Sequence, residues 1–123
     1  MNFSDSTSTI DELKETVKNF CEERDWDQFH NAKDLAIGVV TEGAELLEPF
    51  RFLTEEQVES LMNDDLRKTE ISDELADILF FLIRFSQKYD INLLESFSKK
   101  MKKNGKRYPA SEFKGKNHKA ESP

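Results

Sequence analysis

The chain has 123 residues, of which 37% are hydrophobic and 35% charged, which suits one helical domain with a modest core. Its net charge of −7 is uneven: residues 1–98 hold 9 basic and 23 acidic residues, whereas residues 99–119 hold nine basic residues and one acid. The acidic body argues against nucleic acid as the main partner, and the single cysteine excludes an intrachain disulfide. No apolar run is long enough to span a membrane and no signal-peptide pattern opens the chain, so we expect a cytoplasmic protein without a membrane partner.

The N-terminal third predicts one helix followed by a loop. Residues 1–8 are short and polar, and we expect them to be disordered. Apolar residues then recur at helical spacing, which predicts a helix over about 9–24 with Thr9 as its N-cap. Residues 24–34 break this period and predict a loop rich in aromatic and polar side chains, where Asn31 caps the next helix.

The middle of the chain predicts two long helices and a short one. A helix over about 32–48 should end at Pro49. The pattern "TEEQ" predicts a capped short helix over 54–62. A wide apolar face then predicts a long helix over 66–88.

The last part predicts one more helix and a tail. Asn92 should cap a helix that ends near Asn104-Gly105, and residues 110–123 should form a basic, flexible tail. We interpret the basic end either as a solvated helix end and tail, or as a segment that helps hold phosphate. No run alternates with period two, so the expected fold is all-α, a four-helix bundle occupying residues 9–109.

Two pairs of acids interrupt the apolar faces of the predicted central helices. Glu42 and Glu45 are three residues apart, as are Glu74 and Asp77, so each pair projects from one side of its helix. If the two helices pack together, four carboxylates converge, which is unfavourable unless protons, basic side chains or cations compensate. The alternative is that these acids lie on solvated helix faces.

An all-carboxylate set favours particular metals. Zinc would require His or Cys ligands, and a di-iron bundle would require Glu-x-x-His motifs that this chain lacks. Oxygen ligands suit Mg²⁺, with Mn²⁺ as the alternative. Because Mg²⁺ bound by carboxylates commonly completes its shell with water and phosphate, the pattern points to chemistry on a nucleotide or another polyphosphate.

These acid pairs, together with "RDWDQFH" at 24–30 and "KNGKRYP" at 103–109, resemble the signature of the MazG-like, all-α nucleoside triphosphate pyrophosphohydrolases. Within that family the chain resembles the dCTP pyrophosphatase branch. The resemblance covers residues 10–110. It implies Mg²⁺-dependent hydrolysis of a (deoxy)nucleoside triphosphate, such as dCTP, to the monophosphate and pyrophosphate. It further implies nucleotide pool sanitation and a homodimer or a tetramer made of dimers.

The resemblance also implies roles for individual residues. The catalytic, metal-binding residues would be Glu42, Glu45, Glu74 and Asp77, and the identity of the general base stays open among them and a metal-bound hydroxide. The implied substrate-binding residues are Trp26, Asp27, Gln28, Phe29, His30, Phe52, Phe81, Asn104 and Arg107.

The chain departs from this branch at one place. Relatives often have Phe-Gln-Trp after the first acid pair, whereas this chain has Phe50-Arg51-Phe52. Phe52 offers a smaller stacking face and no indole N–H, so base preference is the property most affected. Two other functions stay open: a non-catalytic helical module that dimerises or docks a partner helix, and hydrolysis of another phosphorylated metabolite.

Overall fold

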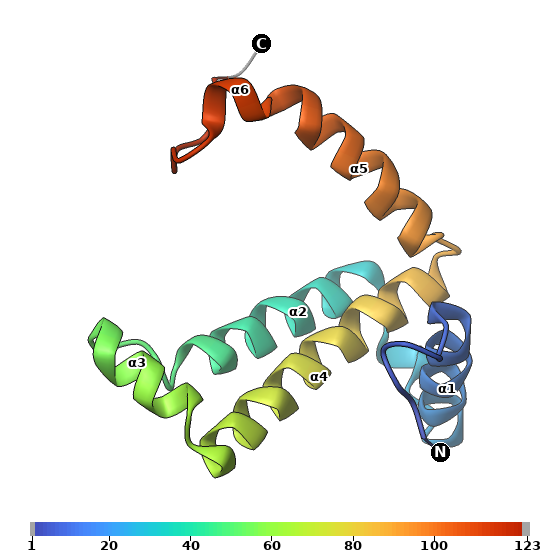
Figure 1. Cartoon of the computed structure of the whole chain (residues 1–123). Helices are drawn as coiled ribbons and strands as arrows, with labels where there is room; N and C mark the ends of the chain where they lie inside the picture. Colours follow the sequence, from blue (N-terminus) through green and yellow to red (C-terminus); the bar gives the residue numbers. More distant parts are fainter. Residues whose placement is uncertain (1, 122–123) are drawn as a thin grey trace. The chain divides into compact units, whose positions relative to one another are not determined.

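The computed structural model describes residues 2–121 and contains helices and turns, with no strand in that range. The predicted all-α class is therefore confirmed. Figure 1 shows the elements in chain order. They are α1 (Ile10–Glu23), η1 (Asp27–Phe29, a 3₁₀ turn), α2 (Ala32–Leu47), α3 (Glu55–Met62), α4 (Asp65–Lys88), α5 (Leu93–Arg107) and α6 (Ala110–Phe113). No helix in the described part of the chain is long and apolar enough to cross a membrane.

Local capping explains where these helices begin. The side chain of Thr9 accepts from the backbone N–H of Glu12 at the start of α1, and Asn31 and Asn92 cap α2 and α5 in the same way. Thr54 and Gln57 form a reciprocal capping box at α3. Each cap satisfies an N–H that has no partner within its helix, so the predicted helix starts are confirmed.

The described residues up to Asp90 form one compact unit built on α4. Helices α2 and α4 lie side by side, α1 packs on α4, and α3 connects the far ends of α2 and α4 (Figure 1). The buried apolar residues of this unit are Cys21, Leu35, Ile71 and Ile83. The long α2–α4 contact places the two acid pairs on facing helices.

Close approach of α2 and α4 depends on Gly38. A Cβ at this position would lie 2.5 Å from Phe81 Cε1 and 2.8 Å from Phe81 Cγ, far inside ordinary contact distance. The aromatic ring of Phe81 therefore occupies the space that any larger residue at position 38 would need.

The residues from Ile91 onward form a second unit that contains α5 and α6. Helix α5 continues to Arg107, so the predicted end at Asn104-Gly105 is wrong. Gly105 has open space around it and sits inside the helix, and the backbone N–H of Tyr108 donates to Asn104. Within the segment predicted to be a tail, α6 packs through Phe113 on Tyr108, with ring centroids 4.9 Å apart.

Candidate metal and nucleotide site

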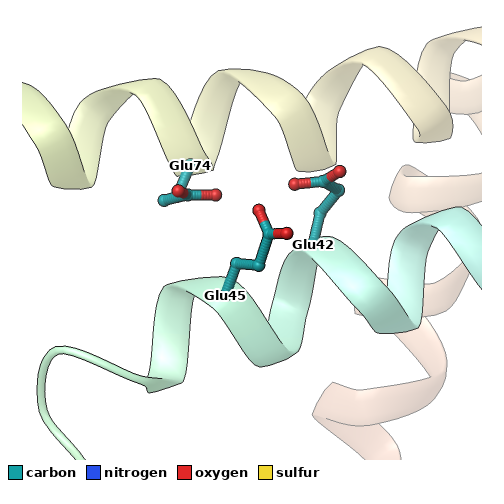
Figure 2. Close-up of side chains that lie close together, drawn as sticks. All are labelled: Glu42, Glu45 and Glu74. Atoms are coloured by element: carbon teal, nitrogen blue, oxygen red, sulfur yellow. The ribbon is translucent and has the colours of Figure 1, made fainter.

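Three carboxylates converge between α2 and α4. Glu42 and Glu45 project from α2 towards α4, and Glu74 projects from α4 towards them (Figure 2). One oxygen of each side chain lies within 4.8 Å of an oxygen of the other two. Three-residue spacing on α2 puts its two acids on the same side of the helix, and the α2–α4 packing adds the third.

These carboxylates lack compensation from the protein. Glu42 Oε2 and Glu74 Oε2 are buried and have no hydrogen-bond partner, and none of the three acids forms an ion pair with a described residue. Unpaired buried carboxylate oxygens are unfavourable, whereas a bound cation satisfies them. The donor set, made only of carboxylate oxygens, fits Mg²⁺ or Mn²⁺.

Burial and crowding raise the pKa of two of these acids, Glu42 and Glu74. Burial raises the pKa of Glu42, and the carboxylates of Glu45, Asp77 and Glu74 raise it further. Burial also raises the pKa of Glu74, with Glu45 and Asp77 adding to the effect. Like charges in a desolvated space disfavour the ionised form, which a divalent cation would favour.

Asp77 lies near this cluster and outside its group of three. Its side chain is exposed, and its charge acts on both Glu42 and Glu74. Asp77 also lines a pocket of about 410 Å³ between α1, the loop after it and α4. The other lining residues are Thr16, Val17, Phe20, Trp26, Ala76 and Phe80.

Three aromatic rings, those of Phe20, Trp26 and Phe80, line this pocket, hereafter the aromatic pocket. The ring of Phe20 lies edge-to-face against Trp26, with centroids 5.5 Å apart, and against Phe80 at 5.9 Å. Phe80 in turn contacts Phe81 at 5.3 Å. A flat apolar base fits such a surface, and Asp77 brings the pocket next to the acid cluster. A larger cavity of about 540 Å³ lies under residues 3–8 and has none of the three clustered acids in its lining.

The loop that carries Trp26 begins at the end of α1. Asp25 adopts a positive φ of 54°, its N–H donates to Glu22, and the N–H of Trp26 donates to Cys21 at 3.0 Å. This pair of bonds is a Schellman motif, which ends the helix and turns the chain. Aspartate tolerates the left-handed conformation better than most residues, so the reversal is encoded locally.

Helix α4 then holds the loop in place through two basic residues. Arg84 donates through Nη2 to Asp27 Oδ1 at 2.9 Å and through Nε to His30 Nδ1 at 3.0 Å. Lys88 Nζ donates to the backbone carbonyl of Asp27 at 2.8 Å. Sequence reasoning missed Arg84 and Lys88, because their partners in this loop lie more than fifty residues away along the chain.

Gln28, Phe29 and Phe52 are three further residues that the sequence predicts to bind substrate. Gln28 donates to Asp25, and Phe29 is largely exposed. Phe52 is 82% exposed beneath the guanidinium of Arg51, 4.8 Å from its ring centroid.

Two further predicted substrate residues, Asn104 and Arg107, belong to α5 in the second unit. The guanidinium of Arg107 donates to the carbonyl of Ala120 at 3.2 Å. The structure therefore brings Trp26 into one pocket with Asp77 and packs Phe81 against Phe80 of that pocket, and it places Asn104 and Arg107 on a separate unit.

Comparison with known proteins adds three findings. Residues 39–111 match the model of the MazG nucleotide pyrophosphohydrolase domain, a range that contains the acid cluster and all of α5. The chain is 29% identical to dCTP pyrophosphatase 1 of Bos taurus over 110 residues, 89% of this chain and 65% of the relative. It is 29% identical to dCTP pyrophosphatase 1 of Homo sapiens over 102 residues, 83% of this chain and 60% of the relative. The chain thus spans less than two thirds of the length of these relatives.

One solved structure is similar to this chain over nearly the whole of its own length. The crystal structure of a pyrophosphatase from Archaeoglobus fulgidus superposes with a TM-score of 0.77 at 30% identity. The match covers 88% of this chain and 99% of the archaeal one. The all-helical fold is therefore shared by both proteins.

Proposed function

Because this chain belongs to the family of MazG nucleotide pyrophosphohydrolase domains, we propose that it hydrolyses a (deoxy)nucleoside triphosphate to the monophosphate and pyrophosphate. One observation carries the proposal: Glu42 and Glu74 each bury a carboxylate oxygen without a partner, within a group of three converging acids. Such a group is tolerated in a folded protein when it binds a divalent cation.

The proposed cation is Mg²⁺, with Mn²⁺ as the alternative, and the residues that would hold it are Glu42, Glu45 and Glu74, with Asp77 beside them. When bound, the cation supplies charge neutralisation for the phosphates and activation of a water molecule. The protein contributes by fixing the carboxylates on two packed helices, so that their geometry is set before substrate arrives.

The aromatic pocket supports a nucleoside as the organic part of the substrate. Trp26, Phe20 and Phe80 offer apolar ring surface on which a base can stack. Asp77 lines the same pocket, so a bound base would place its phosphates near the acid cluster. The names of the relatives favour dCTP or a related deoxynucleotide.

We further propose that the protein is a homodimer or a homotetramer. On α2, Ile37 and Val40 are exposed, and on α4, Leu75, Leu79 and Leu82 are exposed along one face. Apolar residues that recur at helical spacing and are exposed in a single chain are typical of helices that pack against another subunit. A cytoplasmic location and a role in nucleotide pool sanitation stay predictions.

The direct test is incubation of the chain with a panel of deoxynucleoside and nucleoside triphosphates and Mg²⁺, with detection of pyrophosphate. We expect release from at least one deoxynucleotide and loss of release in Glu45→Gln. The matched control is Glu48→Gln, which removes an exposed carboxylate at the end of the same helix and should retain activity. Folded protein that releases no pyrophosphate from any nucleotide would refute the proposal and favour a non-catalytic module.

A further inference from the structure

Arg84 is a fully buried cation outside the acid cluster. Only 1% of the residue is exposed, and it comes from the C-terminal half of α4. Buried guanidinium groups persist in folded proteins when each N–H group has an acceptor. Here the acceptors are His30, Asp27 and Gln87, so Arg84 connects α4 to the loop between α1 and α2.

The bond from Arg84 to His30 determines the protonation of the imidazole. Arginine has donors and no acceptor, and its Nε lies 3.0 Å from His30 Nδ1. Nδ1 must therefore present a lone pair, and a neutral imidazole with an unprotonated Nδ1 carries its proton on Nε2. A cationic His30 would place two N–H groups against each other.

We propose that Arg84 is a positioning residue that fixes His30 as the Nε2–H tautomer and anchors Asp27, so that the loop presents a hydrogen-bond donor to an acceptor oxygen of the nucleotide. This proposal rests on the proposed function. The position of His30 supports it, because its ring centroid lies 6.3 Å from that of Trp26, which lines the aromatic pocket together with Asp77. Arg84 itself is buried, so it acts through His30 and Asp27.

The surrounding charges maintain this neutral state. Burial lowers the pKa of His30, and the positive charges of Arg84 and Lys88 on α4 lower it further. Asp27 in η1 and Asp34 in α2 act in the opposite direction. Loss of the charge at position 84 should therefore raise the pKa of His30, and its protonation should then occur at higher pH.

The first test needs no enzymatic activity. The chain contains two histidines, His30 and His118, so the variant His118→Gln leaves one imidazole, and long-range ¹H–¹⁵N NMR spectra report its tautomer directly. We expect the Nε2–H form near neutral pH. Observation of the Nδ1–H form, or of a cationic ring, would overturn the proposal.

The second test separates binding from chemistry. Arg84→Met removes the donors, and we expect KM for the nucleotide to rise about tenfold, as for loss of one hydrogen bond, with a smaller change in kcat. The pKa of His30 should rise in the same variant. Arg84→Lys keeps the charge without the planar fork and should restore the lowered pKa while recovering only part of the KM. The matched control is Arg67→Met, which removes an exposed arginine from the same helix and should leave KM unchanged.

A milder variant keeps the proposal testable if Arg84→Met fails to fold. In His30→Asn, the amide oxygen can accept from Arg84 in place of Nδ1, while the donor at the Nε2 position is lost. We expect near-native stability and a KM raised about tenfold. An unchanged KM in this folded variant would overturn the proposal.

Inhibition by pyrophosphate identifies the acceptor of the hydrogen bond from His30, and turnover by the unsubstituted chain separates failure of this inference from failure of the proposed function. If inorganic pyrophosphate inhibits His30→Asn less strongly than the unsubstituted chain, the acceptor is a phosphate oxygen; if inhibition is unchanged while KM rises, the acceptor lies on the nucleoside. Failure of the proposed function would appear as no turnover by the unsubstituted chain, whereas failure of this inference would appear as normal turnover with the wrong tautomer.

Discussion

Replacement of Gly38 by alanine tests whether the α2–α4 contact sets the geometry of the site. The new methyl group would lie 2.5 Å from Phe81 Cε1 and 2.8 Å from Phe81 Cγ, so the ring must move or the helices must separate. Overpacking of this kind costs about 1–3 kcal/mol. Replacement of glycine by alanine inside a helix contributes about 0.8–1 kcal/mol in the other direction. The net result should be a loss of about 0–2 kcal/mol in the free energy of unfolding.

Gly43 provides a matched control in the same helix. A Cβ at Gly43 meets no atom within 4 Å, so Gly43→Ala should gain the helix-propensity term alone, about 0.8–1 kcal/mol. The two variants should therefore differ by about 1–3 kcal/mol in urea unfolding followed by circular dichroism, or by several degrees in melting temperature.

The same substitution should alter binding of the nucleotide. Phe81 contacts Phe80, and Phe80 lines the aromatic pocket, so displacement of Phe81 should raise KM for the substrate. If Gly38→Ala were as stable as Gly43→Ala and kept its KM, Phe81 would not depend on the absence of a side chain at position 38, and the reasoning would be refuted.

Three further predictions concern the acids and the cysteine. Glu42→Gln removes one of the converging charges, so its Tm in EDTA should be higher than that of the unsubstituted chain. Addition of Mg²⁺ should raise the Tm of the variant by less than it raises that of the unsubstituted chain, and an equal increase would contradict the site. Lys88 Nζ lies 3.2 Å from Asp27 Oδ1, and this interaction, together with the charge of Arg84, lowers the pKa of the Asp27 carboxyl from its ordinary 3.8. The ionised carboxylate therefore stabilises the fold above pH 3.8, and this stabilisation is lost as pH falls through the lowered pKa. Asp27→Asn should thus lose stability at neutral pH and show a flatter acid unfolding profile, and a profile that matches the unsubstituted chain would exclude this role. Burial raises the pKa of the Cys21 thiol, so labelling by a thiol reagent should be slow in folded protein and fast in urea; equally fast labelling in both would show that α1 detaches readily.

The sequence was sufficient to predict the helices where the signal is local. Thr9, Asn31, Thr54 and Asn92 each accept from an N–H three residues later, and that interaction needs no tertiary contact. The end of α5 was missed because a glycine in a helix interior is tolerated when neighbouring residues keep their hydrogen bonds.

Helical spacing and helix packing account for the convergence of three of the four predicted acids, whereas the roles of these residues stay predictions. The spacing of Glu42 and Glu45 puts both on one side of α2, and packing then adds Glu74. Asp77 lies at the edge of the group, because the distance between its carboxylate and the others depends on how α4 is rotated against α2. The contacts of Arg84 with His30 and Asp27 could not be predicted, because they depend on tertiary folding across more than fifty residues.

The central claim is cleavage between the α and β phosphates at the acid cluster, and ³¹P NMR of the products tests it most directly. With dCTP or another accepted deoxynucleotide and Mg²⁺, the account predicts the nucleoside monophosphate and pyrophosphate as the only products, with none formed by Glu45→Gln. Formation of the nucleoside diphosphate and inorganic phosphate, or equal turnover by Glu45→Gln, would contradict it.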